Sequence, residues 1–175
     1  MATFKVQGGI KLKGELHPQG AKNEALQVLC AVLLTPEEVI MENVPNIRDV
    51  NILIDLLRDL NVKVNQIDEE TYSFKADEVD VDYLSSEDYK IKSSRIRGSI
   101  MIVGPLLARY GKGYIPRPGG DKIGRRRVDT HFIGFEKLGA KFIYDSKEEF
   151  YRVTADKLTG TYTLLDEASV TGTAN

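Results

Sequence analysis

Apolar residues recur along this chain at two spacings, one typical of helices and one typical of strands. They return every three or four residues from Ala21 to Leu34 and from Ile47 to Leu60, which predicts two helices that each bury one face. The same spacing predicts helices from Ser93 or Ser94 to Tyr110 and from Val128 to Leu138. Alternating or short apolar runs predict strands at 4–8, 10–16, 38–43, 62–66, 71–76, 111–115, 141–144, 150–155 and 162–165. The stretch 79–92 is poorly patterned, and we expect a loop with one short strand there.

An internal repeat underlies the order of these elements. Val50-Asn51 and the segment 60–64 recur 78 residues further on, as Val128-Asp129 and the segment 138–142. Each unit is predicted to run helix, strand, turn, helix, strand, strand. The chain ends at residues 169–175, where the first helix of a third unit would begin. We therefore expect a fragment of a longer protein, and the alternative is an ordinary ragged C-terminus.

Composition narrows the class of protein. The chain has 175 residues, of which 42% are hydrophobic and 29% charged, a balance that favours one globular domain over a disordered segment. No apolar run is long enough to span a bilayer and no signal peptide is visible, so we expect no membrane partner. The single cysteine, Cys30, excludes an internal disulfide and suits a reducing compartment. The two histidines and Cys30 lie far apart and have no metal-site spacing, and a net charge of −2 does not indicate a nucleic-acid partner.

Charge is unevenly distributed, and its most basic stretch is a glycine-rich loop. From Lys90 to Arg127 the chain is almost purely basic, with Asp121 as its one acid. The segment 116–131 begins with prolines and glycines and ends where a helix is expected, with Asp129 or Thr130 as its cap. Backbone N–H groups and the helix dipole both favour an anion at such a place. Asp121 is then either a salt-bridge partner, which the loop chemistry alone favours, or a proton-transfer group.

Two further cations stand at predicted helix starts. Lys22 falls in the first turn of one helix and Arg97 in the first turns of another, where the helix dipole disfavours positive charge. Each is either a solvated surface residue or a cation held in place to meet an anion. The residues alone leave both readings open.

Several short motifs carry a resemblance to a known family. They are Gly20-Ala21-Lys22-Asn23, Asn43-Val44-Pro45, Arg97-Gly98-Ser99-Ile100, Gly104-Pro105-Leu106, Pro118-Gly119-Gly120, Ile123-Gly124, Arg126, Val128-Asp129, His131 and Leu138-Gly139-Ala140. With them the chain resembles, over essentially its whole length, the N-terminal part of the UDP-N-acetylglucosamine 1-carboxyvinyltransferases. These enolpyruvyl transferases catalyse the first committed step of peptidoglycan synthesis.

The resemblance implies an α/β fold in which repeated α/β units form an inside-out barrel, with helices inside and sheets outside. About two of the three units of one domain are expected here, so residues 22–175 are an incomplete domain that lacks its third unit. Residues 1–21 are expected to form strands that belong to the second domain of the full-length protein. The remainder of the same enzyme is thus an expected partner.

The reaction implied is transfer of the enolpyruvyl group from phosphoenolpyruvate to the 3-hydroxyl of UDP-N-acetylglucosamine, with release of phosphate. It needs no metal or cofactor and is expected in the bacterial cytoplasm, where it supports cell wall biogenesis, cell shape and cell division. The isolated chain is expected to be inactive because the family's general base lies beyond residue 175. The alternative reading is a non-catalytic α/β module that binds an anion or a sugar nucleotide.

The resemblance also implies roles for individual residues. Those expected to be catalytic are Asp121, as proton donor, and Lys22. Those expected to bind phosphoenolpyruvate are Lys22 and Asn23. Those expected to bind UDP-N-acetylglucosamine are Arg97, Arg126, Val128, Asp129, Ser169 and Val170.

Three positions depart from the family pattern. Asp121 stands where most members have cysteine, so resistance to the epoxide antibiotic fosfomycin is expected. Arg127 replaces a usual proline, which alters the expected shape of the loop. Glu167 replaces a common lysine, which weakens the assignment of the neighbouring Ser169 and Val170.

Overall fold

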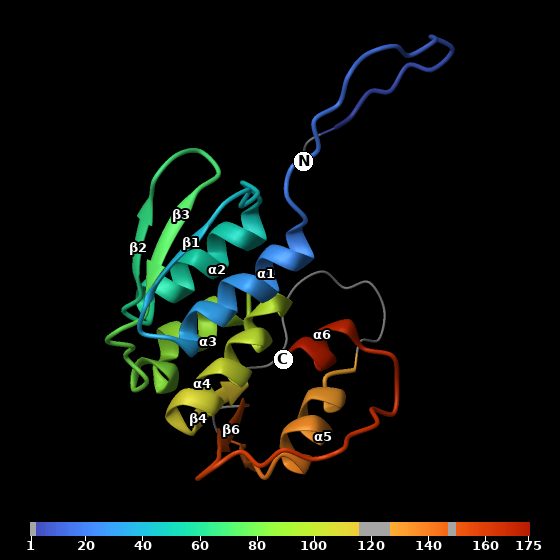
Figure 1. The fold of residues 1–175 in the computed structure, drawn as a ribbon. Helices are drawn as coiled ribbons and strands as arrows, with labels where there is room; N and C mark the ends of the chain where they lie inside the picture. The colour runs from blue at the N-terminus through green and yellow to red at the C-terminus, as the bar shows by residue number, and fades with distance from the viewer. Residues whose placement is uncertain (1–2, 116–126, 147–149) are drawn as a thin grey trace.

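Two three-stranded antiparallel sheets, with helices between them, form the body of the molecule in a computed structural model that describes residues 3–115, 127–146 and 150–175 (Figure 1). The first sheet has the order β1 (Glu38–Met41), β3 (Tyr72–Lys75), β2 (Lys63–Gln66). The second has the order β4 (Lys112–Ile115), β6 (Phe150–Thr154), β5 (Lys141–Asp145). The last strand of each unit thus lies in the middle of its sheet, and the predicted arrangement of helices inside and sheets outside is confirmed.

The helices follow the predicted apolar spacing in most places. The first unit contains α1 (Lys22–Ala31), the 3-10 helix η1 (Val32–Leu34) and α2 (Arg48–Asp59). The second contains the 3-10 helix η3 (Arg97–Ile102), α4 (Val103–Tyr110) and α5 (Asp129–Lys137). Between the units lie η2 (Tyr83–Ser85) and α3 (Glu87–Ser93), and α6 (Val170–Ala174) follows the second unit.

The hydrophobic core lies where α1, α2 and α4 meet the inner faces of the sheets. Leu29, Leu53 and Leu106 are completely buried there, as the predicted helix faces require. Cys30 is buried in the same core, and this burial raises the pKa of its thiol far above the ordinary value. Arg109 of α4 links the two units by hydrogen bonds: its Nη1 donates to the backbone carbonyls of Ala76, at 2.7 Å, and Leu33, at 3.2 Å.

The internal repeat is visible in the backbone. Strands β2 and β5 begin at residues 63 and 141, and β3 and β6 begin at residues 72 and 150, so both pairs keep the offset of 78. Two residues that follow a helix have left-handed backbone: Asn61, between α2 and β2, with φ 65°, and Gly139, between α5 and β5, with φ 99°. The same turn therefore ends the second helix of each unit, with asparagine in one copy and glycine in the other.

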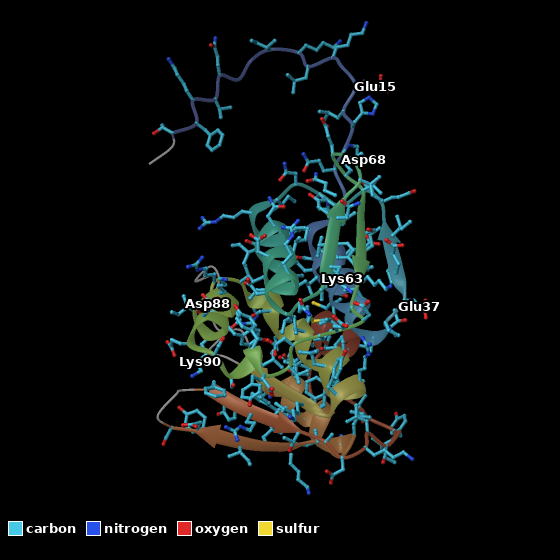
Figure 2. All side chains as sticks on the ribbon, turned by 90° about the vertical axis from the view of Figure 1, so that its left-hand side faces the viewer. Glu15, Glu37, Lys63, Asp68, Asp88 and Lys90 are labelled. Atoms are coloured by element: carbon cyan, nitrogen blue, oxygen red, sulfur yellow. The ribbon has the colours of Figure 1, made fainter. Side chains whose placement is uncertain are left out.

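The first residues of the chain differ from the prediction. Residues 3–21 form no strand or helix; they extend away from the body as an arm that folds back on itself (Figures 1 and 2). Phe4, Leu12 and Leu16 are each more than 90% exposed. The predicted strands are therefore not formed, because a strand needs neighbours to satisfy its backbone groups and the body offers this arm none. Their assignment to a second domain stays a prediction.

Three other predictions of secondary structure are corrected. The stretch 79–92 contains helices rather than a strand, since the Ser86 hydroxyl accepts a hydrogen bond from the Tyr89 N–H at 3.1 Å and caps α3. Ser94 ends α3 instead of starting the next helix, which begins at Arg97. Residues 162–165 form no strand.

The left-handed turn at Gly139 gives a test of the fold. A Cβ at Gly139 would meet only the Lys157 carbonyl, at 3.6 Å, so Gly139→Ala should cost about 1–2 kcal/mol of backbone strain alone. Gly134, inside α5, has nothing within 4 Å of its Cβ position, so Gly134→Ala should stabilise the chain by roughly 0.5–1 kcal/mol. Urea unfolding followed by circular dichroism measures both values. Equal effects of the two substitutions would contradict the assigned turn.

Candidate functional site

Residues from the first turns of several helices line one cleft of about 950 Å³. Six of the residues predicted from the sequence to bind substrates lie on its walls: Lys22, Asn23, Arg97, Asp129, Ser169 and Val170. They come from α1, η3, α5 and α6, and their positions span nearly 150 residues of sequence, so the fold brings the predicted set together. Of the other predicted residues, Val128 is the N-cap of α5 and is half-buried beside the cleft rather than on its wall. Asp121 and Arg126 lie outside the described residues.

Lys22 is paired within the cleft. It is the first residue of α1, and its Nζ lies 3.0 Å from Oδ2 of Asp49 in the first turn of α2. The carboxylate is well placed at a helix start, whereas the ammonium is not, so the pair offsets an unfavourable position of Lys22. No sequence motif points to Asp49, because its contact with Lys22 spans 27 residues and follows from how α1 and α2 pack.

Arg127 also lies on the wall of this cleft. Its Nε lies 2.9 Å from Oδ1 and 3.0 Å from Oδ2 of Asp129, and its Nη2 lies 2.6 Å from Oδ2 of the same residue. The same Nη2 also donates to Asp166. These pairs raise the pKa of the Arg127 guanidinium, and hydrogen bonding to Arg127 holds the pKa of Asp129 below its ordinary value. Arg97 joins the group by donating from Nη2 to the Arg127 backbone carbonyl at 2.8 Å.

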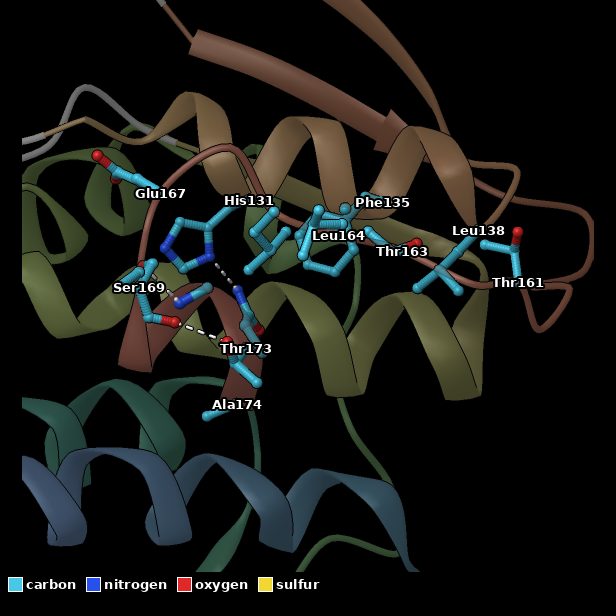
Figure 3. A pocket seen from close by; sticks show the side chains of 15 residues that line it. His131, Phe135, Leu138, Thr161, Thr163, Leu164, Glu167, Ser169, Thr173 and Ala174 are labelled. Carbon is cyan, nitrogen blue, oxygen red and sulfur yellow. Dashed lines mark hydrogen bonds between the residues drawn. The ribbon is translucent and has the colours of Figure 1, made fainter.

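A partly buried polar cluster fixes the position of α6 beside the cleft. The side chain of Asn175 donates from Nδ2 to the Ile100 carbonyl at 3.0 Å and accepts from the Gly104 N–H at 3.0 Å. Its Nδ2 also lies 3.1 Å from Nδ1 of His131, the contact that is drawn as a dashed line from His131 in Figure 3. Burial, and then the nearby Arg97, lower the pKa of His131, so the imidazole is neutral at pH 7 and Nδ1 is the acceptor.

A second hollow of about 720 Å³ lies behind this cluster, between α5, α6 and the segment 161–168 (Figure 3). Its walls include Phe135, Leu138 and Leu164, and it shares Glu167, Ser169 and His131 with the cleft. The two hollows are thus separated by α6 and the residues that lead into it.

Charge in the cleft is balanced among the described residues. The cations on its walls are Lys22, Arg97 and Arg127, and the carboxylates are Asp49, Asp129 and Glu167. Glu167 itself accepts a hydrogen bond from the Thr130 hydroxyl at 2.9 Å. An anion entering this cleft must therefore exchange places with a carboxylate or use further cations. The sequence holds four of these immediately before Arg127, outside the described residues: Arg117, Lys122, Arg125 and Arg126.

The described residues also bear on metal binding and on membrane insertion. Among the residues that the structure describes, no three or more histidine, cysteine or acidic side chains are grouped so that they could hold a metal ion. Within the same ranges, no helix has the length and apolar character needed to cross a membrane.

Comparison with known proteins identifies the family. Residues 6–175 match the protein family described as EPSP synthase (3-phosphoshikimate 1-carboxyvinyltransferase). Over all 175 residues the chain is 58% identical to the UDP-N-acetylglucosamine 1-carboxyvinyltransferase of Bacteroides thetaiotaomicron and 55% identical to that of Porphyromonas gingivalis. In both cases the whole of this chain covers 40% of the relative, so it spans about two fifths of their length.

Solved structures show the same fold. The enolpyruvyl transferase NikO from Streptomyces tendae superposes with a TM-score of 0.70 at 21% identity, covering 87% of this chain and 32% of NikO. The EPSP synthase of Acinetobacter baumannii gives a TM-score of 0.62 at 13% identity, covering 92% of this chain and 36% of that enzyme. The inside-out arrangement of repeated α/β units is therefore the fold of these enzymes. From the match over residues 6–175, the chain belongs to the EPSP synthase (3-phosphoshikimate 1-carboxyvinyltransferase) family.

Proposed function

We propose that the protein to which this chain belongs transfers the enolpyruvyl group of phosphoenolpyruvate to the 3-hydroxyl of UDP-N-acetylglucosamine and releases phosphate. One observation carries the proposal: Lys22, Arg97 and Asp129, which are distant in sequence, line a single cleft at the starts of three helices. The relatives that share 55–58% of its residues are named for this reaction. The product would enter peptidoglycan synthesis in the cytoplasm, and with it cell wall growth, shape and division.

Both substrates are anions, and the cleft offers positioned donors for them. We assign phosphoenolpyruvate to the side of Lys22 and Asn23, because these two residues share the first turn of α1. Lys22 would leave Asp49 and bind a phosphate or carboxylate oxygen of the substrate. This interaction would strengthen as negative charge develops on the leaving phosphate. The UDP-sugar is assigned to the wall formed by Arg97, Asp129 and Ser169, together with Val128, Val170 and Arg126.

Asp121 is proposed as the acid that protonates the methylene carbon of phosphoenolpyruvate while the sugar hydroxyl attacks the adjacent carbon. An aspartic acid ordinarily titrates near ~3.9, so keeping its proton at neutral pH costs about 4 kcal/mol. Expulsion of water and the negative charge of phosphoenolpyruvate both favour the neutral acid and offset part of that cost. The sugar hydroxyl gives its proton to the general base expected in the remainder of the enzyme. Phosphate then leaves from the tetrahedral intermediate as the new methyl group loses a proton, which restores the carbon–carbon double bond. No metal or cofactor enters this scheme.

The rest of the enzyme is the proposed partner of this chain. The exposed apolar side chains of the arm, Phe4, Leu12 and Leu16 among them, would be covered if residues 1–21 completed a sheet of a second domain. Residues 22–175 would then be two units of a domain whose third unit is supplied by the longer chain. The isolated chain would be inactive, because the general base is expected in the remainder. A binding module without catalysis remains the second candidate.

Phosphate release tests the function. In the full-length protein, phosphate should be released only when phosphoenolpyruvate and UDP-N-acetylglucosamine are both present, and the 175-residue chain alone should release none. Lys22→Ala should lower kcat/KM by about 10- to 100-fold, because removing a positioned charged donor costs roughly 1.5–3 kcal/mol.

Lys63 is the matched control for Lys22. Lys63 lies on β2 of the first sheet (Figure 2) and is not among the residues that line the cleft. Its Nζ lies 2.9 Å from Oδ2 of Asp77, so Lys63→Ala should change kcat/KM less than about twofold. Equal losses in the two variants would refute the role of Lys22. Binding of UDP-N-acetylglucosamine without any phosphate release would favour the binding module.

Asp121 makes a separate prediction about fosfomycin. This epoxide is attacked by a thiolate at the corresponding position of related enzymes, and a carboxylate is a much weaker nucleophile toward it. The full-length protein should resist inactivation, and Asp121→Cys should restore it. Because a thiol ordinarily titrates near ~8.5, activity of the Asp121→Cys variant should also persist to higher pH than that of the aspartate enzyme.

Asp121→Asn completes this test, because an amide keeps the size of the side chain but cannot donate the proton. Most activity should be lost. Full activity of Asp121→Asn, or inactivation by fosfomycin at the rate of the cysteine variant, would eliminate Asp121 as the proton donor.

A further inference from the structure

Arg127 contacts three separate parts of the cleft wall at once. Its guanidinium holds Asp129 at the start of α5 and Asp166 in the segment that leads to α6. Its backbone carbonyl accepts the hydrogen bond from Arg97 at the start of η3. We propose that Arg127 is a positioning residue for the UDP-sugar: it fixes the distance between the α5 wall and the α6 wall and orients Arg97 between them. This inference rests on the function proposed above.

The geometry requires an arginine. A planar guanidinium presents several N–H groups in a fixed fork, so it can take both oxygens of Asp129 and still donate to Asp166. A lysine ammonium is a point charge on a flexible stem and cannot hold two carboxylates in one defined plane. The single positive charge of Arg127 also lies between two carboxylates and reduces their repulsion of each other and of an incoming diphosphate.

The segment held by Arg127 carries residues of the cleft wall. Asp166 is followed by Glu167, which is tied to Thr130 of α5 at 2.9 Å, and by Ser169, whose hydroxyl accepts from the Gly172 N–H at 3.1 Å. The far end of α6 is fixed separately through Asn175. Releasing the Arg127 side chain would therefore loosen the entrance to α6, which keeps its contact with α5 through Glu167. It would also let the carbonyl that Arg97 contacts shift, while the end of α6 held by Asn175 stays in place.

The effect should appear in binding rather than in stability. The side chains of Arg127, Asp129 and Asp166 are 38%, 49% and 40% exposed, and exposed ion pairs contribute little to the free energy of unfolding. A variant at Arg127 should thus fold normally and lose substrate affinity, which separates a positioning role from a purely structural one.

The experiment uses the full-length protein with Arg127→Gln and Arg127→Lys. Arg127→Gln should raise KM for UDP-N-acetylglucosamine about tenfold, with kcat and KM for phosphoenolpyruvate changed less than about twofold and the thermal midpoint unchanged. Arg127→Lys should recover only part of the loss. Arg58→Gln is the control. Arg58 forms an exposed ion pair with Asp55, 2.9 Å long, and does not line the cleft, so KM should not change in this variant.

Asp166→Asn distinguishes positioning from simple attraction. If Arg127 acted only by its charge, removing an acid from the wall would lower KM for the anionic substrate. If it acts by holding Asp166, Asp166→Asn should raise KM, and the double variant with Arg127→Gln should be no worse than Arg127→Gln alone. A lowered KM in Asp166→Asn, additive losses in the double variant, or a KM unchanged in Arg127→Gln would overturn the proposal.

Failure of the proposed function would look different. It would appear as absence of phosphate release from the unsubstituted full-length protein. The role of Arg127 would then be measured by equilibrium binding of UDP-N-acetylglucosamine, where Arg127→Gln should weaken binding by the same factor of about ten. If the unsubstituted protein and Arg127→Gln bound UDP-N-acetylglucosamine equally well, the role of Arg127 would be refuted independently of the proposed function.

Discussion

The site depends on one constraint of the fold, the convergence of helix starts on a single cleft. Lys22, Arg97 and Asp129 are the first residues of α1, η3 and α5, and Val170 begins α6. The first N–H groups of a helix have no partner within it, and the dipole makes this end positive. Acids are favourable there, and cations are favourable only when an anion is near them. The packing of repeated units thus gathers helix starts around one cleft, and the cations on its walls are held by partners such as Asp49.

How much of the fold can be predicted from one sequence depends on how far apart in the sequence the interacting residues lie. Apolar spacing located α1 and α2, and the offset of 78 located corresponding strands, because these signals are local or repeated. The stretch 79–92 was mispredicted because its pattern is set by the Ser86 cap rather than by periodic apolar residues. The arm at 3–21 does alternate, yet alternation alone forms no strand when no neighbouring strand is present.

The same distinction applies to the cleft. Short motifs point to Lys22, Asn23 and Arg97 through the resemblance, and the fold places all three on the walls of one cleft. The pairing of Arg127 with Asp166 spans 39 residues and depends on how α6 packs against α5, which no local pattern encodes. From the sequence, Arg127 is only a departure from the family pattern. Its contacts with Asp129, Asp166 and Arg97 are visible only in the structure.

The paired cations also bear on how such a cleft could select phosphates. The side chains of Lys22 and Asp49 are 43% and 40% exposed, so their pair contributes about 0–1 kcal/mol and is easily exchanged. A phosphate carries more charge than a carboxylate and offers more acceptor oxygens, so it can displace Asp49 where a weaker anion cannot. Because Asp49 lies in the first turn of α2, it keeps a favourable environment after Lys22 leaves. The ion pair with Asp49 would thus hold Lys22 in position before the substrate arrives and would weaken binding of the substrate only slightly.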